Sequence, residues 1–161
     1  MTITIKKRDG SRMPFNADRI NKSIERACYG ITDPISKVIQ IATETRLTLY
    51  DGITTEELDL ATINAALQNT QYDLEFDKIA TRLLLKVIYK KVIGDYDPDD
   101  EAGIMSKEDF KKLHANHFSE YINEAVENNL LDSRLITLFN LNELAATLNV
   151  DRDELYKYSG L

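Results

Sequence analysis

Cysteine is almost absent from this 161-residue sequence, which contains Cys28 alone. A single thiol excludes an internal disulfide and dithiol redox chemistry, and it leaves too few ligands for a zinc ribbon, which needs about four Cys or His side chains. The two histidines, His114 and His117, have no cysteine or carboxylate at ligand spacing, so we interpret them as surface residues. We therefore expect no metal site and no redox cofactor in this chain.

Long apolar runs are also missing. No stretch approaches the roughly 20 apolar residues that a membrane-spanning helix needs, and the first seven residues lack the charged leader and apolar segment of a secretory signal. The cytoplasm is the expected compartment, with no membrane partner. The GxxxxGK[ST] and GxGxxG phosphate-binding patterns are absent, and no Ser-His-Asp set stands out.

The net charge of −7 is unevenly distributed along the chain. Residues 1–26 hold seven bases against three acids, whereas residues 95–161 hold six bases against fifteen acids. A basic tip on an acidic body attracts a small polyanion locally, and the acidic remainder would repel a long nucleic acid. The alternative is a solvated, lysine-rich N-terminus without a ligand.

The N-terminal segment has the pattern of a short β-hairpin. Polar and apolar residues alternate over Thr2–Lys6, which predicts a strand, and Asp9-Gly10 predicts a tight turn. The return strand is expected over about Arg12–Phe15. Pro14 within it has no N–H to donate, which confines that strand to a sheet edge.

Four helices are predicted between residues 16 and 94. Their start signals are Asn16 or Asp18, Asp33 followed by Pro34, the capping-box pair Thr54 and Glu57, and Asp73. Helical spacing predicts that the buried face of the second helix carries Ile35, Val38, Ala42 and Leu49. The third helix has apolar residues on two sides, Leu58 on one and Leu60 on the other, which predicts a central position. Cys28 is expected on the buried face of the first.

An acidic, proline-containing segment, residues 95–101, then predicts a linker or exposed loop. Further helices are expected from about Ser106 to Asn128, near Asn140–Asn149 and over Asp151–Tyr158. The predicted organisation is a domain of residues 1–94 followed by residues 95–161, a helical extension too small and too polar to be an independent domain.

The hairpin turn and its surroundings form a candidate nucleotide cradle. Turn amides with Lys7 and Arg8 beside them can hold phosphate oxygens, and Asn16 stands at a helix N-terminus, which attracts anions. Arg19 follows one turn later, while Met13 and Phe15 offer apolar area for a purine. The alternative is an ordinary hairpin whose charged edge blocks edge-to-edge pairing.

Two more segments could complete such a site. Thr54 and Thr55 open the third helix, so one hydroxyl can cap it while the other faces a ligand, and Asp59 shares a helix face with Thr55. Lys90 and Lys91 end the fourth helix. Their alternative role is a favourable interaction with the negative end of the helix dipole.

Several segments occur together in an order that resembles a known family. They are Ile5–Ser11, Phe15–Ile20, Tyr50–Thr55, Ala80–Leu83 and Lys90-Lys91. This set is similar to the ATP-cone, the regulatory module at the N-terminus of many ribonucleotide reductase large subunits. The resemblance implies a mainly α fold, in which a four-helix bundle is capped by an N-terminal hairpin or three-stranded sheet and followed by a helical extension.

The resemblance also implies a role. The cone is the allosteric overall-activity site of ribonucleoside-diphosphate reductase: ATP activates, dATP inhibits, and the nucleotide controls quaternary state. The implied partners are the rest of the large subunit, the radical-generating small subunit and further copies on dATP binding, with Mg²⁺ expected alongside the phosphates. The alternative function is a ligand-free helical protein-interaction module.

The resemblance assigns site residues by motif. The expected nucleotide contacts are Lys7, Arg8, Met13, Phe15, Asn16, Arg19, Ile20, Thr55, Asp59 and Lys90. Two positions depart from part of the family, because many cones have glutamate in place of Met13 and some have histidine in place of Asp59. The family's catalytic cysteines are absent, so we expect a non-catalytic fragment of the reductase.

Overall fold

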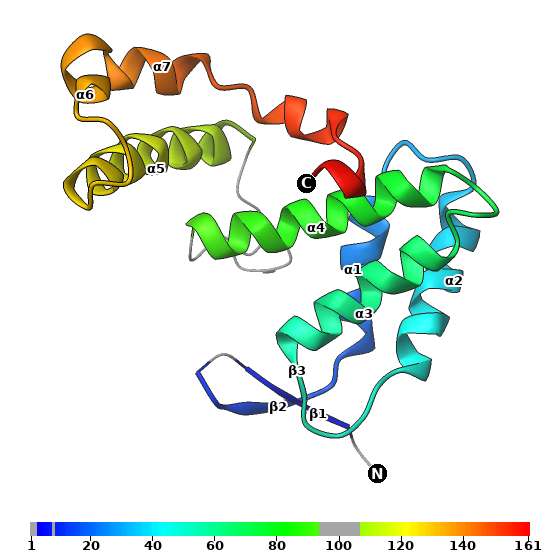
Figure 1. Cartoon of the computed structure of the whole chain (residues 1–161). Helices are drawn as coiled ribbons and strands as arrows, with labels where there is room; N and C mark the ends of the chain where they lie inside the picture. Colours follow the sequence, from blue (N-terminus) through cyan, green and yellow to red (C-terminus); the bar gives the residue numbers. More distant parts are fainter. Residues whose placement is uncertain (1–2, 8, 94–106) are drawn as a thin grey trace. The chain divides into compact units, whose positions relative to one another are not determined.

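A small sheet begins the chain (Figure 1). Strand β1 (Thr4–Lys6) lies in the middle, with β2 (Arg12–Pro14) antiparallel on one side and β3 (Ile53–Thr54) parallel on the other. The hairpin is thus confirmed, and Pro14 lies on an edge strand as predicted. The computed structural model describes residues 3–7, 9–93 and 107–161.

Helices make up most of the described residues, which confirms the mainly α fold class. The bundle that follows the sheet consists of α1 (Ala17–Ala27), α2 (Pro34–Leu47), α3 (Thr55–Gln68) and α4 (Glu75–Ile93). Beyond it lie α5 (Lys107–Glu127), α6 (Arg134–Leu138), α7 (Leu141–Thr147) and two 3-10 helices, η1 (Val150–Leu155) and η2 (Tyr158–Gly160).

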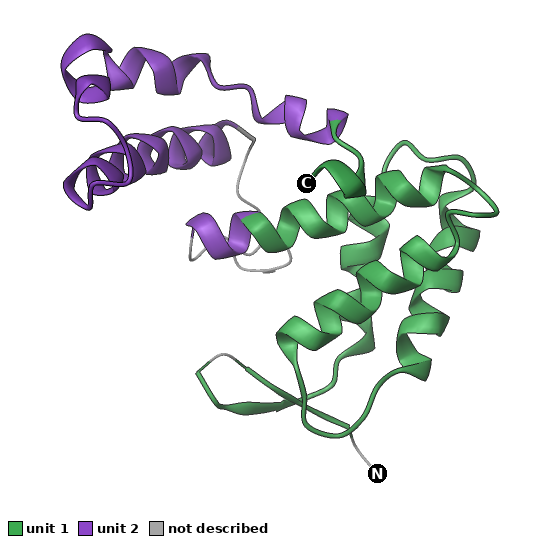
Figure 2. Cartoon of the chain, viewed as in Figure 1, with its two compact units in different colours: residues 1–88, 156–161 green, residues 89–155 purple. Residues whose placement is uncertain are grey.

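The chain divides into two compact units, coloured separately in Figure 2. The first unit comprises residues 1–88 and 156–161, and the second comprises residues 89–155. Helix α4 therefore contributes to both. The predicted linker over 95–101 lies outside the described residues, and the predicted division at residue 94 stays a prediction. None of the described helices is both long and apolar enough to cross a membrane.

The core of the first unit lies among α1, α2, α3 and α4. Ile24, Ile41 and Ile79 are fully buried there. Cys28 is fully buried as predicted, and burial raises the pKa of its thiol to about 11, which keeps it protonated and unreactive at neutral pH. A separate apolar cluster of Ile5, Ile53 and Leu58 joins the sheet to the bundle.

Two of the predicted helix starts have the expected hydrogen bonds. The Asn16 side chain caps α1, and Thr54 and Glu57 form the complete capping box of α3. Asp33 occupies the N-cap of α2 before Pro34, but its side chain makes no cap hydrogen bond. Its φ of 46° is left-handed, whereas a capping residue usually has an extended backbone.

The buried face of α2 is confirmed in part. Ala42 is buried, and Val38 and Leu49 pack against the apolar clusters as predicted. Ile35, expected in the core, is instead 72% exposed, and the buried side also includes Lys37, Ile41 and Thr45. Leu60 of α3 is likewise more exposed than predicted, at 52%.

Lys37 is buried because its ammonium group has three oxygen partners. Nζ lies 2.7 Å from both Asp73 Oδ2 and Glu75 Oε2, and it donates to the Thr32 carbonyl at 2.8 Å. Burial lowers the pKa of Lys37, but the two carboxylates outweigh it and leave this pKa above its ordinary value. The hydrogen bonds of Lys37 in turn lower the pKa of Asp73 and of Glu75. This ion cluster ties α2 to the start of α4.

The second unit is built on a small apolar cluster. Ile93, Phe110 and Val150 are buried together, with Tyr89 packed against them. The helix predicted over Asp151–Tyr158 is instead the 3-10 helix η1, in which Val150 alone is buried. A short polar segment with so little buried apolar surface gains too little from packing to extend as an α-helix.

Candidate functional site

Two helix N-termini border the sheet. Only Phe15 and Asn16 separate β2 from α1, and α3 begins directly after β3. The first backbone N–H groups of a helix have no partner within the helix and carry partial positive charge. An anion is therefore favoured beside this sheet, near the hairpin in Figure 1.

Strand register brings basic residues next to the start of α3. Lys6 pairs with Thr54 across the parallel β1–β3 pair, so Lys7 follows β1 and Thr55 follows β3 at the same end of the two strands. The start of α1 lies towards the other end of β1, because β2 runs antiparallel and ends opposite Thr4. The two helix starts therefore lie at opposite ends of β1 and on opposite sides of it, since β2 and β3 flank this strand.

A carboxylate fixes the position of β3 against β1. Asp51 Oδ1 accepts hydrogen bonds from the N–H of Thr4 at 2.8 Å and from its hydroxyl at 2.7 Å. These bonds, together with the charge of Arg12, lower the pKa of Asp51. The N–H of Gly52, at a φ of 84°, donates to the Thr4 carbonyl. Sequence analysis gave Asp51 no hydrogen-bond partner, because nothing local reveals one 47 residues away.

The backbone of the hairpin turn is occupied by its own hydrogen bonds. Lys7 N–H donates to the Ser11 carbonyl at 2.8 Å, and Gly10 N–H donates to the Lys7 carbonyl at 3.0 Å. Ser11 donates through both its N–H and its hydroxyl to Asp9, which lowers the pKa of that carboxyl group. The amides of Lys7, Gly10 and Ser11 are therefore engaged within the turn, and of the expected phosphate donors here the structure leaves the Lys7 side chain.

Of the neighbouring threonines Thr54 and Thr55, the first caps α3 as predicted, and the ligand contact of the second stays a prediction. Thr54 Oγ1 accepts from Glu57 N–H at 3.2 Å and donates to Glu57 Oε2 at 2.8 Å, so it is committed to capping α3. Thr55, at the first helical position, is half-buried, as is Asp59 one turn later. Their contact with a ligand above the helix N-terminus stays a prediction.

Asn16 is partly committed to the fold. Its side-chain oxygen accepts from Asp18 N–H at 2.9 Å and from Arg19 N–H at 3.4 Å. The amide NH₂ group remains the part of Asn16 that could donate to a ligand. Arg19, in the first turn of α1, is exposed.

Three apolar site candidates line the junction of sheet and bundle. Met13, Phe15 and Ile20 are half-buried and pack against the cluster of Ile5, Ile53 and Leu58. Their inner surfaces are used by the core, and the remaining exposed surface can support the flat face of a base. The structure thus assembles the expected apolar residues on one cluster, although they come from β2, α1 and the segment between them.

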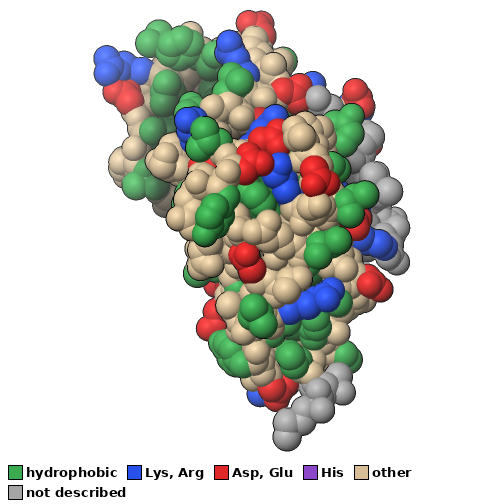
Figure 3. Space-filling model, turned by 90° about the vertical axis from the view of Figure 1, so that its right-hand side faces the viewer, with side chains coloured by type: hydrophobic (Ala, Val, Ile, Leu, Met, Phe, Trp, Pro, Cys, Tyr) green, Lys and Arg blue, Asp and Glu red, His purple; other side chains and the backbone are tan. Residues whose placement is uncertain are grey.

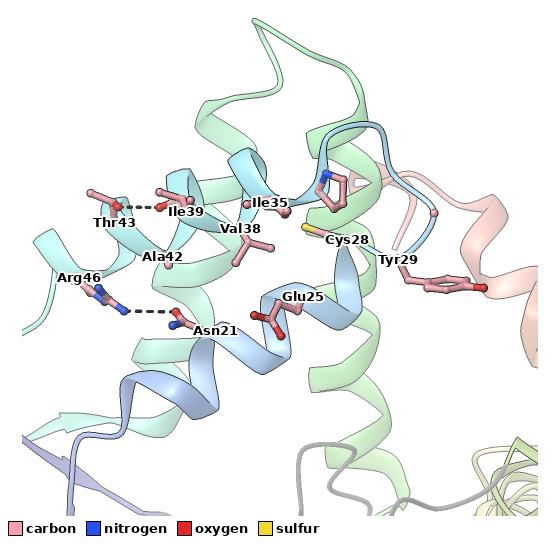
Figure 4. Close-up of a pocket in the computed structure, with 12 residues that line it drawn as sticks. Asn21, Glu25, Cys28, Tyr29, Ile35, Val38, Ile39, Ala42, Thr43 and Arg46 are labelled. Carbon is pink, nitrogen blue, oxygen red and sulfur yellow. Dashed lines mark hydrogen bonds between the residues drawn. The ribbon is translucent and has the colours of Figure 1, made fainter.

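A groove of about 620 Å³ lies between α1 and α2 (Figure 4). Val38 and Ala42 of α2 line it opposite α1, and Arg46 at one end donates to Asn21 Oδ1. None of the ten expected nucleotide contacts lines this groove. Its largely apolar lining suits a protein contact better than a triphosphate.

The α1–α2 groove is bordered by exposed apolar side chains. Tyr29 is 82% exposed and Ile39 is 61% exposed. Apolar side chains also reach the surface between charged ones on the face shown in Figure 3. Contiguous apolar surface beside a groove is typical of interaction sites. Sequence analysis did not predict this surface, because it assigned apolar residues of α2 such as Ile35 to the core.

A family model describes the part of the chain that builds this geometry. The ATP cone domain matches residues 3–91, more than half of the sequence. The chain belongs to the ATP-cone family. The sheet, the four helices and the residues around the hairpin all lie within the matched range. Membership in the ATP-cone family implies a nucleotide effector and supports a regulatory, allosteric role.

Several relatives of this ATP-cone chain are large subunits of one enzyme. Ribonucleoside-diphosphate reductase subunit alpha of Chlamydia trachomatis is 28% identical over 161 residues, which cover 99% of this chain and 14% of the relative. The large subunit from Danio rerio is 26% identical over 96% of this chain and 18% of its own length. Ribonucleoside-diphosphate reductase 1 subunit alpha of Escherichia coli is 28% identical over 60% of this chain and 12% of its own length. The chain thus spans less than a fifth of these relatives.

Two expected contacts of the ATP-cone site are not placed with the others. Arg8 lies outside the described residues. Lys90 is in the last turn of α4 and belongs to the second unit, whereas the other described candidates belong to the first. The phosphate contacts of both stay predictions from the resemblance.

Proposed function

We propose that this ATP-cone chain binds ATP or dATP as an allosteric effector at the sheet and the adjoining helix N-termini. The observation that carries the proposal is the register of β1 and β3, which puts Lys7 next to the first turn of α3. A basic side chain and a helix N-terminus at one place favour a polyphosphate.

The phosphates would lie at the Lys7 end of the sheet. Thr55 offers a hydroxyl there, and the turn next to it supplies Lys7 and Arg8 as cations. Lys90 is the further phosphate contact that the resemblance predicts. Mg²⁺ would enter with the nucleotide, bound to phosphate oxygens, as this ion usually is. Among the described residues, no three or more His, Cys, Asp or Glu side chains are grouped so that they could hold a metal.

The nucleoside would lie towards the start of α1. Met13, Phe15 and Ile20 provide apolar surface there, and the Asn16 amide provides a donor. Arg19 and Asp59 complete the polar contacts predicted by motif. Met13 replaces an acceptor found in many cones, so recognition of the adenine edge would depend more on stacking than on a carboxylate.

Regulation would follow from a coupling between nucleotide binding and the quaternary state of the protein. ATP and dATP differ by one hydroxyl, so their opposite effects require different contacts in two quaternary states. A coupling free energy of about 1–3 kcal/mol per site is sufficient. The assembly would be the reductase whose large subunits this chain resembles, including its small subunit and further copies of the chain.

Calorimetric titration of dATP tests the binding site. The wild-type chain is expected to bind, and the double variant Lys7→Ala/Arg8→Ala to bind at least about tenfold more weakly, the effect of losing one charge-assisted hydrogen bond worth about 1.5 kcal/mol. Lys22→Ala/Arg26→Ala, which removes the same charge from exposed positions on α1, is the control and should bind like wild type. Absence of both heat and thermal stabilisation at millimolar dATP would refute the proposal.

A second candidate function is protein binding without a ligand. The α1–α2 groove and the exposed Tyr29 and Ile39 beside it favour this candidate. It predicts that dATP produces neither binding heat nor thermal stabilisation in the wild type or in the Lys7→Ala/Arg8→Ala variant. The calorimetric comparison therefore separates the two functions.

A further inference from the structure

The α1–α2 groove carries two exposed charges of opposite sign, Glu25 on α1 and Arg46 on α2 (Figure 4). Arg46 donates to Asn21 Oδ1 at 3.4 Å, which is a long contact with a neutral amide. Within the described part of the chain, no carboxylate pairs with Arg46 and no cation pairs with Glu25. Both charges are therefore available to a partner of the groove.

The two charges lie about one helical turn apart along the groove. Asn21 and Glu25 are four residues apart on α1, which is about 6 Å along the helix axis, and Arg46 reaches the Asn21 end of this interval. A pair of opposite charges is its own complement under a twofold rotation. A second copy turned about an axis between the charges brings its Arg46 to Glu25 and its Glu25 to Arg46.

Exposed apolar side chains flank the charges on α2. Ile39 is 61% exposed and Leu47 is 81% exposed. Because Arg46, at the end of α2, contacts Asn21, near the start of α1, the two helices run in opposite directions. Ile39 thus lies towards the Glu25 end and Leu47 beyond Arg46. The rotation that exchanges the charges brings Ile39 of one copy towards Leu47 of the other, which removes apolar surface from water.

We propose that the α1–α2 groove faces the same groove of a second copy of this chain, in a twofold dimer with two reciprocal Glu25–Arg46 ion pairs. A twofold contact uses one patch twice, so each group must find its complement within that patch. This groove meets the condition with charges of both signs and apolar side chains beside them. All of these residues belong to the first unit. The inference goes beyond the proposed function, because it names the surface between copies and requires no nucleotide.

Sedimentation velocity on the full chain, without nucleotide and with saturating dATP, tests for the dimer. Concentrations up to about 1 mM detect even the weak association of small interfaces, and the wild type is expected to dimerise in both conditions. Glu25→Arg or Arg46→Glu places like charges opposite one another twice, so each variant alone should associate at least about tenfold more weakly. Circular dichroism checks that these variants, changed at exposed helix positions, keep the fold.

Mixing the two variants tests the reciprocal pairing. One variant has only positive charges at the paired positions and the other only negative ones, so an equal mixture should form dimers with one chain of each kind. Native mass spectrometry identifies this heterodimer by its mass. The double variant Glu25→Arg/Arg46→Glu exchanges both charges and should associate within about threefold of wild type. Lys78→Glu is the control, because it makes the same charge change at an exposed position of α4 outside the groove, and it should associate like wild type.

Three results would overturn the proposal. They are a wild type that stays monomeric in both conditions, single variants that associate like wild type, and two weakened variants whose mixture forms no heterodimer. Calorimetry measures dATP binding separately, so the loss of the dimer and the loss of the nucleotide site are distinguishable.

Discussion

Lys37 illustrates at the residue scale why composition alone misassigns a core. Its four-carbon stem and ammonium group are only 7% exposed, yet the charge is retained because Asp73, Glu75 and the Thr32 carbonyl surround it. A buried cation with oxygen partners costs far less than an unpaired one. The two carboxylates lie 36 and 38 residues further along the chain than Lys37, so no local pattern predicts them.

The Lys37 cluster gives a prediction for stability. Lys37→Met keeps an unbranched stem but removes the ammonium, and we expect it to lower the free energy of unfolding at pH 7 by about 1–3 kcal/mol, the usual cost of losing hydrogen bonds to a charged group. Urea denaturation monitored by circular dichroism measures this difference. A variant as stable as wild type would contradict a stabilising role for the cluster.

The same cluster predicts how stability depends on pH. The folded-state pKa values of Asp73 and Glu75 lie below their unfolded values of about 3.9 and 4.3. Their contribution is therefore fully present above about pH 4.3 and is lost as the pH falls through the folded-state values, because the unfolded chain binds protons first. Lys37→Met should flatten this part of the pH profile, and an unchanged slope would contradict the assignment.

The residue scale also shows what could be predicted of the site. Lys7, Thr55, Met13 and Phe15 were predicted as site residues from local signals, namely a basic residue at a turn, a doubled threonine at a helix start and apolar residues between elements, whereas Ile20 was added by the family resemblance. The contribution of Asp51 was missed, because its hydrogen bonds to Thr4 depend on which strands pair.

At the scale of elements, the residues at which helices begin were predictable, and the faces that the helices bury were less so. The capping box of α3 requires only Thr54 and Glu57 three residues apart, which a sequence displays directly. The buried face of α2 depends on a tertiary ion cluster, which exposes Ile35. Strand β3 has two residues and exists because β1 is available for pairing, so its pattern alone could not define it.

The neighbouring threonines at the start of α3 supply a further prediction. Thr54→Ala removes the cap and should lower the free energy of unfolding by about 1 kcal/mol, with little effect on nucleotide affinity once folding is corrected for. Thr55→Ala is the matched control: it should leave stability nearly unchanged and weaken dATP binding. Thermal unfolding and calorimetry on the two variants test the division. A Thr54→Ala variant that mainly loses dATP affinity, together with a Thr55→Ala variant that mainly loses stability, would contradict this division.

At the scale of the whole molecule, the exposed apolar side chains beside the α1–α2 groove support the proposal that this chain contacts other protein. From the sequence, protein partners were predicted through the family resemblance alone. The groove could not be predicted, because it arises from how α1 and α2 pack.

Ile39 offers a test of that surface. Ile39→Glu places a charge beside the groove at a position 61% exposed, so we expect stability to change by no more than about 0.5 kcal/mol. Self-association in the presence of dATP should weaken, while dATP affinity stays within about twofold. Ser36→Glu adds the same charge elsewhere on α2 and is the control. Sedimentation velocity is the measurement, and equal association of both variants and wild type would exclude the groove as the contact.

The central claim, that an adenine nucleotide binds where the hairpin meets the helix starts, is tested most directly by mapping backbone amide chemical shifts while dATP is added. We predict saturable changes at Lys7, at the starts of α1 and α3, and at the last turn of α4, with the α1–α2 groove little affected. Changes centred on the groove, or none at millimolar dATP, would contradict the claim.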